Sequence, residues 1–205
     1  GINMISKPKG YDEAPAYTGE FSQLPAGLYV CEILGVKQEE YNGHSRFIMQ
    51  FDIAEGEHKG FYQKQYSMEK QTNQNAKYKG VHRQNMEDQG LPFFKGLMTS
   101  VERSNPGYHF PWGTQGNENT LKGKKFGAVM GREEFLTSDG QKRMATKVVQ
   151  IRSVDGLKDA RVPEDKLLDD NSVQEPQMTP ASDPALAADG FMNIPDGIDE
   201  ELPFM

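Results

Sequence analysis

The chain has 205 residues, 36% of them hydrophobic and 26% charged, which is typical of a globular protein with one or two domains. It contains no run of about 18 apolar residues that could cross a membrane, and its first residues lack the basic and apolar regions of a signal peptide. A single cysteine, Cys31, excludes an internal disulfide and fits a reducing compartment. We therefore expect a cytoplasmic protein with no membrane partner.

The net charge of −7 is unevenly distributed along the chain. Residues 167–205 hold nine acidic residues and no basic one, which leaves 21 of the 30 acidic residues against 23 basic residues elsewhere. Residues 59–152 alone hold 16 basic and 8 acidic residues. A basic middle followed by an acidic end indicates an anion-binding body with a separate interaction tail. A solvated surface with a solubilising tail would give the same distribution.

The first half of the chain is predicted to form an arm and three strands. Residues 1–23 contain proline and glycine but little apolar periodicity, and we interpret them as an N-terminal arm. A β-rich strand follows at 28–36, and Asn42-Gly43 predicts a tight hairpin turn. The strand at 46–53 places Phe47, Met49, Phe51 and Ile53 on one face. Alternating aromatic and polar residues predict a third strand at 61–66.

The second half is predicted to contain helices and then a hairpin. Residues 71–79 are rich in Asn and Gln and indicate a loop, and 81–87 indicate a short helix. Apolar residues three and four apart predict a helix at 91–101, with Pro92 in its first turn. A loop rich in Gly, Asn and Pro follows at 104–120, before strands at 124–136 and 142–154 that are joined by a turn at 138–141.

Residues from about 170 to 198 are rich in Pro, Asp and Ala and cannot bury enough surface to fold. We therefore divide the chain into an arm (1–23), a body (24–166) and a disordered acidic tail (167–205). The element order of the body matches the OB-fold, a five-stranded partly open barrel that binds oligonucleotides. The expected fold class is mainly β: a five-stranded OB-like barrel with one helix between strands 3 and 4. A split β-sandwich with one helix fits the same order.

Enzymatic signatures are scarce, so we predict that the protein is not an enzyme and uses no metal or cofactor. The segment Gly123-Lys124-Lys125 lacks the other residues of a phosphate-binding loop. The four histidines are spread over separate regions without zinc-binding spacing, and each is expected to be a solvated loop residue. Cys31 is expected to be a buried, inert thiol.

Basic and aromatic residues are interleaved, as in proteins that hold single strands in a positively charged groove with stacking rings. The candidate nucleic-acid-binding residues are Tyr62, Lys64, Tyr66, Lys77, Tyr78, Lys79, Arg83, Tyr108, Trp112, Lys122, Lys124, Lys125, Arg132, Lys142, Arg143 and Lys147. Some have an equally good structural explanation: Tyr62 and Tyr66 could belong to the core, and Tyr108 and Trp112 could pin their loop to the barrel. Phe47, Phe51 and Phe94 are expected in the core.

The chain ends in a pattern that resembles the acidic tip of bacterial and phage single-stranded DNA-binding proteins. The residues that carry the resemblance are Asp199, Glu200, Glu201, Leu202, Pro203 and Phe204. In that family the phenylalanine enters an apolar pocket of a replication, recombination or repair protein, and the carboxylates meet basic residues around it. Met205 departs from the pattern, because the family's phenylalanine usually carries the chain carboxylate.

Residues 24–30, which read Leu-Pro-Ala-Gly-Leu-Tyr-Val, also resemble the start of phage early proteins found among replication genes. Together the resemblances imply a binder of single-stranded DNA with little sequence preference, acting in the bacterial host cytoplasm. They imply recruitment of replication and recombination proteins through the tail, and a homo-oligomer is compatible with them. A phage replisome or recombination adaptor that binds protein rather than DNA remains the alternative, with a structural phage component as a third.

Overall fold

Two long strands joined by a tight turn form the centre of the protein, for which a computed structural model describes residues 3–14, 16 and 23–168. Strands β1 (Gly27–Tyr41) and β2 (His44–Ile53) pair antiparallel from Cys31↔Ile53 to Tyr41↔His44. Asn42 and Gly43 between them have φ angles of 55° and 81°. Two successive positive φ angles define the turn whose twist matches that of the strands it joins, so the predicted hairpin is confirmed.

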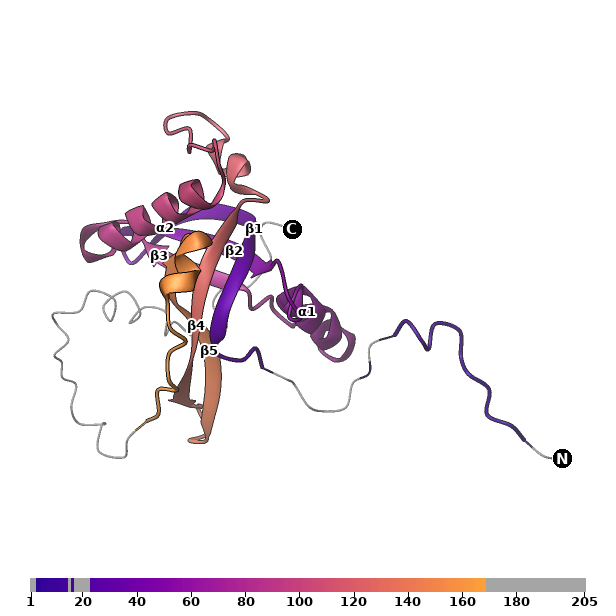
Figure 1. Ribbon diagram of the computed structural model, residues 1–205. Helices are drawn as coiled ribbons and strands as arrows, with labels where there is room; N and C mark the ends of the chain where they lie inside the picture. The colour runs from indigo at the N-terminus through magenta and orange to yellow at the C-terminus, as the bar shows by residue number, and fades with distance from the viewer. Residues whose placement is uncertain (1–2, 15, 17–22, 169–205) are drawn as a thin grey trace.

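The sheet has five strands, all paired antiparallel, in the order β3-β2-β1-β4-β5 (Figure 1). Its other members are β3 (Val81–Asn85), β4 (Lys125–Leu136) and β5 (Lys142–Arg152). The mainly β class and the β4–β5 hairpin are confirmed. The expected barrel is not: within the described residues β3 and β5 do not pair, so the sheet is not closed. Helix α2 (Leu91–Ser104) contacts β3, β4 and β5.

Helix α2 (Leu91–Ser104) lies between β3 and β4 in the sequence, as predicted, with proline in its first turn. Its buried face consists of Phe94, Leu97, Met98 and Val101, and the Phe94 ring lies 5.3 Å from that of Phe47. Asn105 fixes the end of the helix to β4, because its side chain bonds to the backbone carbonyl and the N–H of Lys125 at 2.9 and 3.0 Å.

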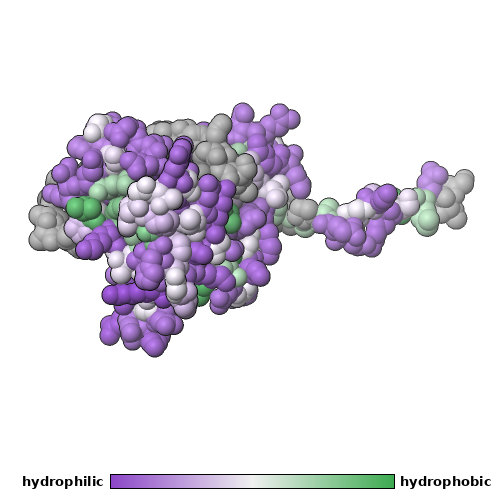
Figure 2. Space-filling model, turned by 90° about the horizontal axis from the view of Figure 1, so that it is seen from above, coloured by the Kyte–Doolittle hydropathy of each residue, from purple (hydrophilic) through white to green (hydrophobic). Residues whose placement is uncertain are grey.

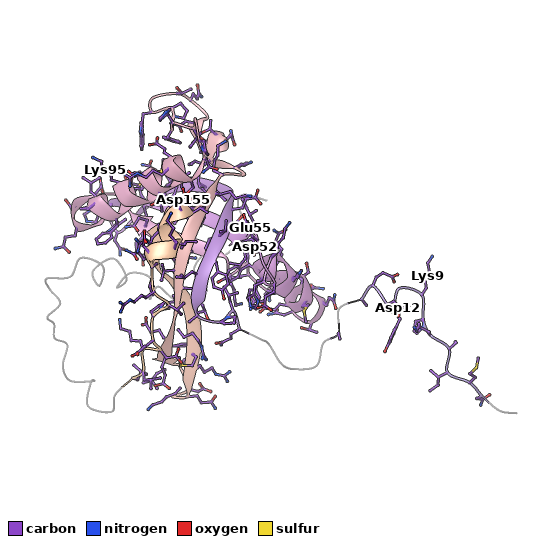
Figure 3. All side chains as sticks on the ribbon, in the orientation of Figure 1. Lys9, Asp12, Asp52, Glu55, Lys95 and Asp155 are labelled. Carbon is purple, nitrogen blue, oxygen red and sulfur yellow. The ribbon has the colours of Figure 1, made fainter. Side chains whose placement is uncertain are left out.

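Residues 61–66 form the start of a helix rather than the predicted third strand. Helix α1 spans Phe61–Thr72, and its first turn is held by Asp52 of β2 (Figure 3). The Asp52 carboxylate accepts the N–H groups of Tyr62 and Gln63 at 2.8 and 3.0 Å, which otherwise have no partner at a helix start. Tyr62 and Tyr66 are four residues apart, a spacing that puts two side chains on one face of a strand or of a helix.

Residues 81–85 form strand β3 rather than the predicted short helix. The strand pairs with β2 from Gln50↔Val81 to Arg46↔Asn85 and buries His82 and Gln84 toward the core. Gly80 allows this close approach, since a Cβ atom there would lie 2.4 Å from the carbonyl oxygen of Phe51. The segment has no apolar alternation because its inward residues are polar. His82 is therefore not the solvated loop residue that was expected.

The core lies between the sheet and α2. It contains Phe47, Phe51 and Phe94, as predicted, together with Cys31, which is fully buried. After β5 the chain forms a short helix, η3 (Asp155–Asp159), and then returns along β4, where Lys166 bridges Glu133. Among the described residues no helix is long and apolar enough to cross a membrane.

Candidate nucleic-acid interface

Three of the tyrosines predicted to bind nucleic acid pack together in or against the core. Tyr62 and Tyr78 are 7% and 5% exposed, and the Tyr66 ring lies 5.9 Å from that of Tyr78. The Tyr78 hydroxyl donates to the backbone carbonyl of Phe51 at 2.8 Å, and burial raises the pKa of both Tyr62 and Tyr78. These two rings are therefore buried in the structure, where they do not face a base, and they account for the core alternative that the sequence left open for Tyr62. Tyr66 is partly buried against the same cluster.

The lysines predicted beside these tyrosines surround α1. Lys64 donates to the backbone carbonyl of Lys59 at 3.1 Å, and Lys79 pairs with Glu69 at 3.2 Å. Lys77 is half-buried in the segment that connects α1 to β3. The cations therefore stand around a helix whose aromatic side chains point inward, rather than on a face with exposed rings.

Residues 105–124, between α2 and β4, carry an exposed aromatic side chain. This segment is here named the Trp112 loop. Trp112 is 63% exposed, and its ring packs edge-on against Phe110 at 4.6 Å and Phe94 at 6.3 Å. The N–H of Phe110 donates to Glu102 of α2 at 2.8 Å, and Asn117 donates to the carbonyl of Pro111 at 3.2 Å. The loop is thus fixed to α2 while it presents the indole ring to solvent.

A second ring of the Trp112 loop lies under a cation. The Nζ atom of Lys124 is 4.7 Å from the ring centroid of Tyr108, close enough for a cation–π interaction. The Tyr108 hydroxyl bonds to Thr120 at 2.8 Å, and partial burial raises the pKa of this phenol. Lys122 is exposed and Lys125 half-buried nearby in the sequence. The structure therefore places Lys124 over Tyr108, while Trp112, Lys122 and Lys125 lie in the same loop or directly after it in the sequence.

The remaining predicted cations lie toward the other end of the β4–β5 hairpin. Arg132 pairs with Asp165 at 3.3 Å, Lys147 with Glu133 at 3.9 Å, and Arg143 bonds to Gln141 near the turn. Lys142 begins β5 beside that turn. The 12 residues of β4 span about 40 Å, so the turn lies far from the Trp112 loop (Figure 1). The single groove that the sequence suggested is divided into separate regions.

A cluster of charged side chains on the sheet was not predicted from the sequence. On the face of β1 and β2 opposite the core, the guanidinium carbon of Arg46 lies 3.9 Å from the ring centroid of Tyr41. Glu39 accepts from Arg46 Nη2 at 2.5 Å and lies 3.5 Å from Lys37 Nζ. Although burial acts to raise it, the pKa of Glu39 is held below its usual value by Arg46 and Lys37. The alternation at 46–53 placed Arg46 on the face of the strand opposite the phenylalanines. This placement was the only indication in the sequence that a charged side chain lies on that face.

Arg83, which the sequence did single out, joins this group. It stands on β3 opposite Ile48, and Lys37 stands opposite Ile48 on the other side. Figure 2 shows that hydrophilic residues predominate on the face seen from above, with small separate hydrophobic areas.

Three further points concern the candidate site. In the part of the chain that the structure describes, no group of three or more His, Cys, Asp or Glu side chains could hold a metal ion. The tail residues Asp199, Glu200, Glu201, Leu202, Pro203 and Phe204 lie outside the described residues. Comparisons with protein-family models and with curated proteins find no match for the chain.

Proposed function

We propose that the protein binds single-stranded DNA with little sequence preference, through base stacking on the Trp112 loop and contacts between lysines and phosphates. The observation that carries the proposal is Trp112, an exposed indole ring that packs edge-on against Phe110 and Phe94. Stacking of one base on such a ring contributes roughly 1–3 kcal/mol and does not depend on base identity. Lys122 and Lys124 in the same loop would supply the cations.

The sheet supports the proposal at the level of the fold. It has β1 at its centre and hairpins at β1–β2 and β4–β5, an arrangement that we interpret as an OB-fold opened between β3 and β5. In OB-folds the loops of these two hairpins contribute to oligonucleotide binding. The cations of the β4–β5 hairpin would then contact a strand that extends beyond the Trp112 loop.

We also propose that the acidic tail recruits replication or recombination proteins. The support for this second part is the sequence alone: three consecutive acidic residues followed by Leu202, Pro203 and Phe204. An aromatic anchor next to several carboxylates suits an apolar pocket with a basic rim.

The chain contains one tryptophan, so its intrinsic fluorescence reports on the proposed site directly. Titration with oligo-dT is expected to quench Trp112, with an affinity that falls steeply as salt is raised because counterions are released. With a fluorescein-labelled oligonucleotide and anisotropy detection, Trp112→Ala is expected to weaken binding by roughly 1–3 kcal/mol. Tyr11→Ala, a change at an equally exposed ring in the N-terminal arm, is the control. Unchanged fluorescence and anisotropy in dilute buffer would refute the proposal.

A further inference from the structure

We infer that Glu102 of α2 is a positioning residue, which fixes the Trp112 loop so that the indole ring is in place before a base binds. Glu102 acts through the backbone of the loop and does not itself stack on the ligand. The inference rests on the proposed function in one respect, which is that the ligand stacks on Trp112. It adds a residue that is neither aromatic nor basic to that site.

The contact that carries the inference joins a side chain of α2 to the backbone of the loop. The Oε2 atom of Glu102 accepts the N–H of Phe110 at 2.8 Å. Phe110 lies two residues before Trp112, and the centroids of their rings are 4.6 Å apart. Hydrogen bonds to an ionised acceptor are shorter and stronger than those between neutral groups. Glu102 therefore holds the backbone beside the indole ring rather than the ring itself.

Helix α2 gives the loop two points of attachment. Phe94 and Glu102 are eight residues apart, a spacing that returns to the same side of a helix and corresponds to about 12 Å along its axis. The Trp112 ring lies 6.3 Å from the Phe94 ring, whereas the Phe110 N–H is bonded to Glu102. The loop therefore runs back along α2, and it is attached through a backbone group at one point and through a ring at the other.

Further contacts hold the loop on the other side of Trp112. Asn117 donates from its side chain to the carbonyl of Pro111 at 3.2 Å, and Leu121 is fully buried in the core. A loop that becomes ordered only on binding loses affinity, by roughly 2- to 12-fold for each side chain that is immobilised. A loop that is held in advance avoids this loss.

The charge of Glu102 gives a second hypothesis, against which the inference can be tested. Burial is the largest cause of the raised pKa of Tyr108, and the charge of Glu102 raises it further, so the carboxylate acts electrostatically on this part of the loop. A carboxylate near DNA repels phosphates. If only its charge mattered, removal of Glu102 would strengthen binding. If its bond to Phe110 positions Trp112, loss of the bond weakens binding.

The fluorescence of the free protein tests positioning without DNA, because Trp112 is the only tryptophan. Glu102→Ala is expected to lower the anisotropy of Trp112 and to increase its quenching by acrylamide. Glu102→Gln keeps an oxygen that can accept the Phe110 N–H, so it should restore both values. Glu118→Ala, which removes an exposed carboxylate from the same loop, is the matched control and should change neither. Equal values in Glu102→Ala and the unmodified protein would overturn the inference.

Anisotropy titration with fluorescein-labelled oligo-dT measures the consequence for binding. The two Glu102 variants carry the same charge and differ in the acceptor oxygen, so their comparison isolates the hydrogen bond. Glu102→Ala is expected to bind roughly 2- to 12-fold more weakly than Glu102→Gln. The slope of log affinity against log salt should be equal in both, because neither change removes a phosphate contact.

A double-mutant cycle shows whether the effect passes through the indole ring. When Trp112→Ala is added to each variant, Glu102→Ala and Glu102→Gln should bind equally, since no ring is left to position. A difference that persists without Trp112 would overturn the inference. Asn117→Ala, which removes the bond to Pro111, should also increase quenching of Trp112 by acrylamide, and it keeps the test valid if Glu102→Ala does not fold.

The outcomes separate this inference from the proposed function. If the unmodified protein binds oligo-dT and Trp112 is quenched, but the two Glu102 variants bind equally, the inference is refuted while the proposed function stands. If the unmodified protein does not bind oligo-dT, the proposed function fails. Glu102 then positions nothing for a base, even where the mobility of Trp112 responds to the substitution.

Discussion

Asp52 shows how one buried carboxylate can connect two elements. It is 2% exposed and accepts the N–H groups of Ile53, Tyr62 and Gln63. Asp52→Ala would leave buried donors without partners, so we expect a loss of about 2–4 kcal/mol in the free energy of unfolding. Urea unfolding followed by circular dichroism measures the loss. Asp159→Ala, at an exposed carboxylate, should change stability by less than about 0.5 kcal/mol.

His82 makes stability depend on pH. Burial, assisted by the charge of Arg83 and opposed by a hydrogen bond with Gln84, lowers the pKa of His82 from 6.5 to about 4. Above pH 6.5 the imidazole is neutral in both the folded and the unfolded chain. Between pH 6.5 and 4 only the unfolded chain binds the proton, so stability falls as the pH falls, by up to about 3 kcal/mol.

Chemical unfolding at a series of pH values measures this dependence. His82→Gln should flatten the part of the curve between pH 6.5 and 4, whereas His109→Gln, at an exposed loop position, should not. A curve that keeps its full slope in the His82 variant would show that other groups cause the loss.

At the scale of elements, two glycines differ in the space available for a side chain. Gly80, just before β3, is tightly enclosed, whereas Gly96 on α2 is open, so alanine substitutions should change stability in opposite directions. A Cβ atom at Gly80 would lie 2.4 Å from the Phe51 carbonyl oxygen and 2.9 Å from the Tyr78 ring, so Gly80→Ala must displace β3. We expect a loss of more than about 2 kcal/mol. Gly96 on α2 has nothing within 4 Å of the same position, so Gly96→Ala should add roughly 0.5–1 kcal/mol. Thermal unfolding of both variants shows whether the signs are opposite.

The elements also show what local patterns could predict. Both hairpins and α2 were predicted from their residues, because turn chemistry and apolar periodicity agree there with the tertiary structure. Residues 61–66 were wrongly predicted to form a strand, because the spacing of their aromatic residues fits both a strand and a helix. The contact that decides in favour of the helix comes from Asp52, nine residues before the helix begins. Strand β3 was missed because its inward residues, His82 and Gln84, are polar. At the site, aromatic residues could be recognised by type, but only packing shows that Tyr62 and Tyr78 are buried whereas Trp112 is exposed.

At the scale of the whole molecule, the acidic end and the basic body are expected to oppose each other. Deleting residues 199–205 removes three carboxylates, so affinity for oligo-dT should stay equal or rise at low salt, and the difference should vanish at high salt. The deletion should also abolish capture of replication and recombination proteins by the immobilised protein. Phe204→Ala, which keeps the charges, should lose capture without changing affinity for DNA. Capture that survives both changes would assign recruitment to another surface.

The hydrogen bonds between Asp52 of β2 and the first turn of α1 also have a consequence for the order of folding. A helix of 12 residues is marginal in water on its own, and the carboxylate that holds its first turn is in place only once β2 has formed. The helix should therefore follow the β1–β2 hairpin in time rather than nucleate it. Residues 61–72 would then become helical as a result of folding and would not serve as its starting point.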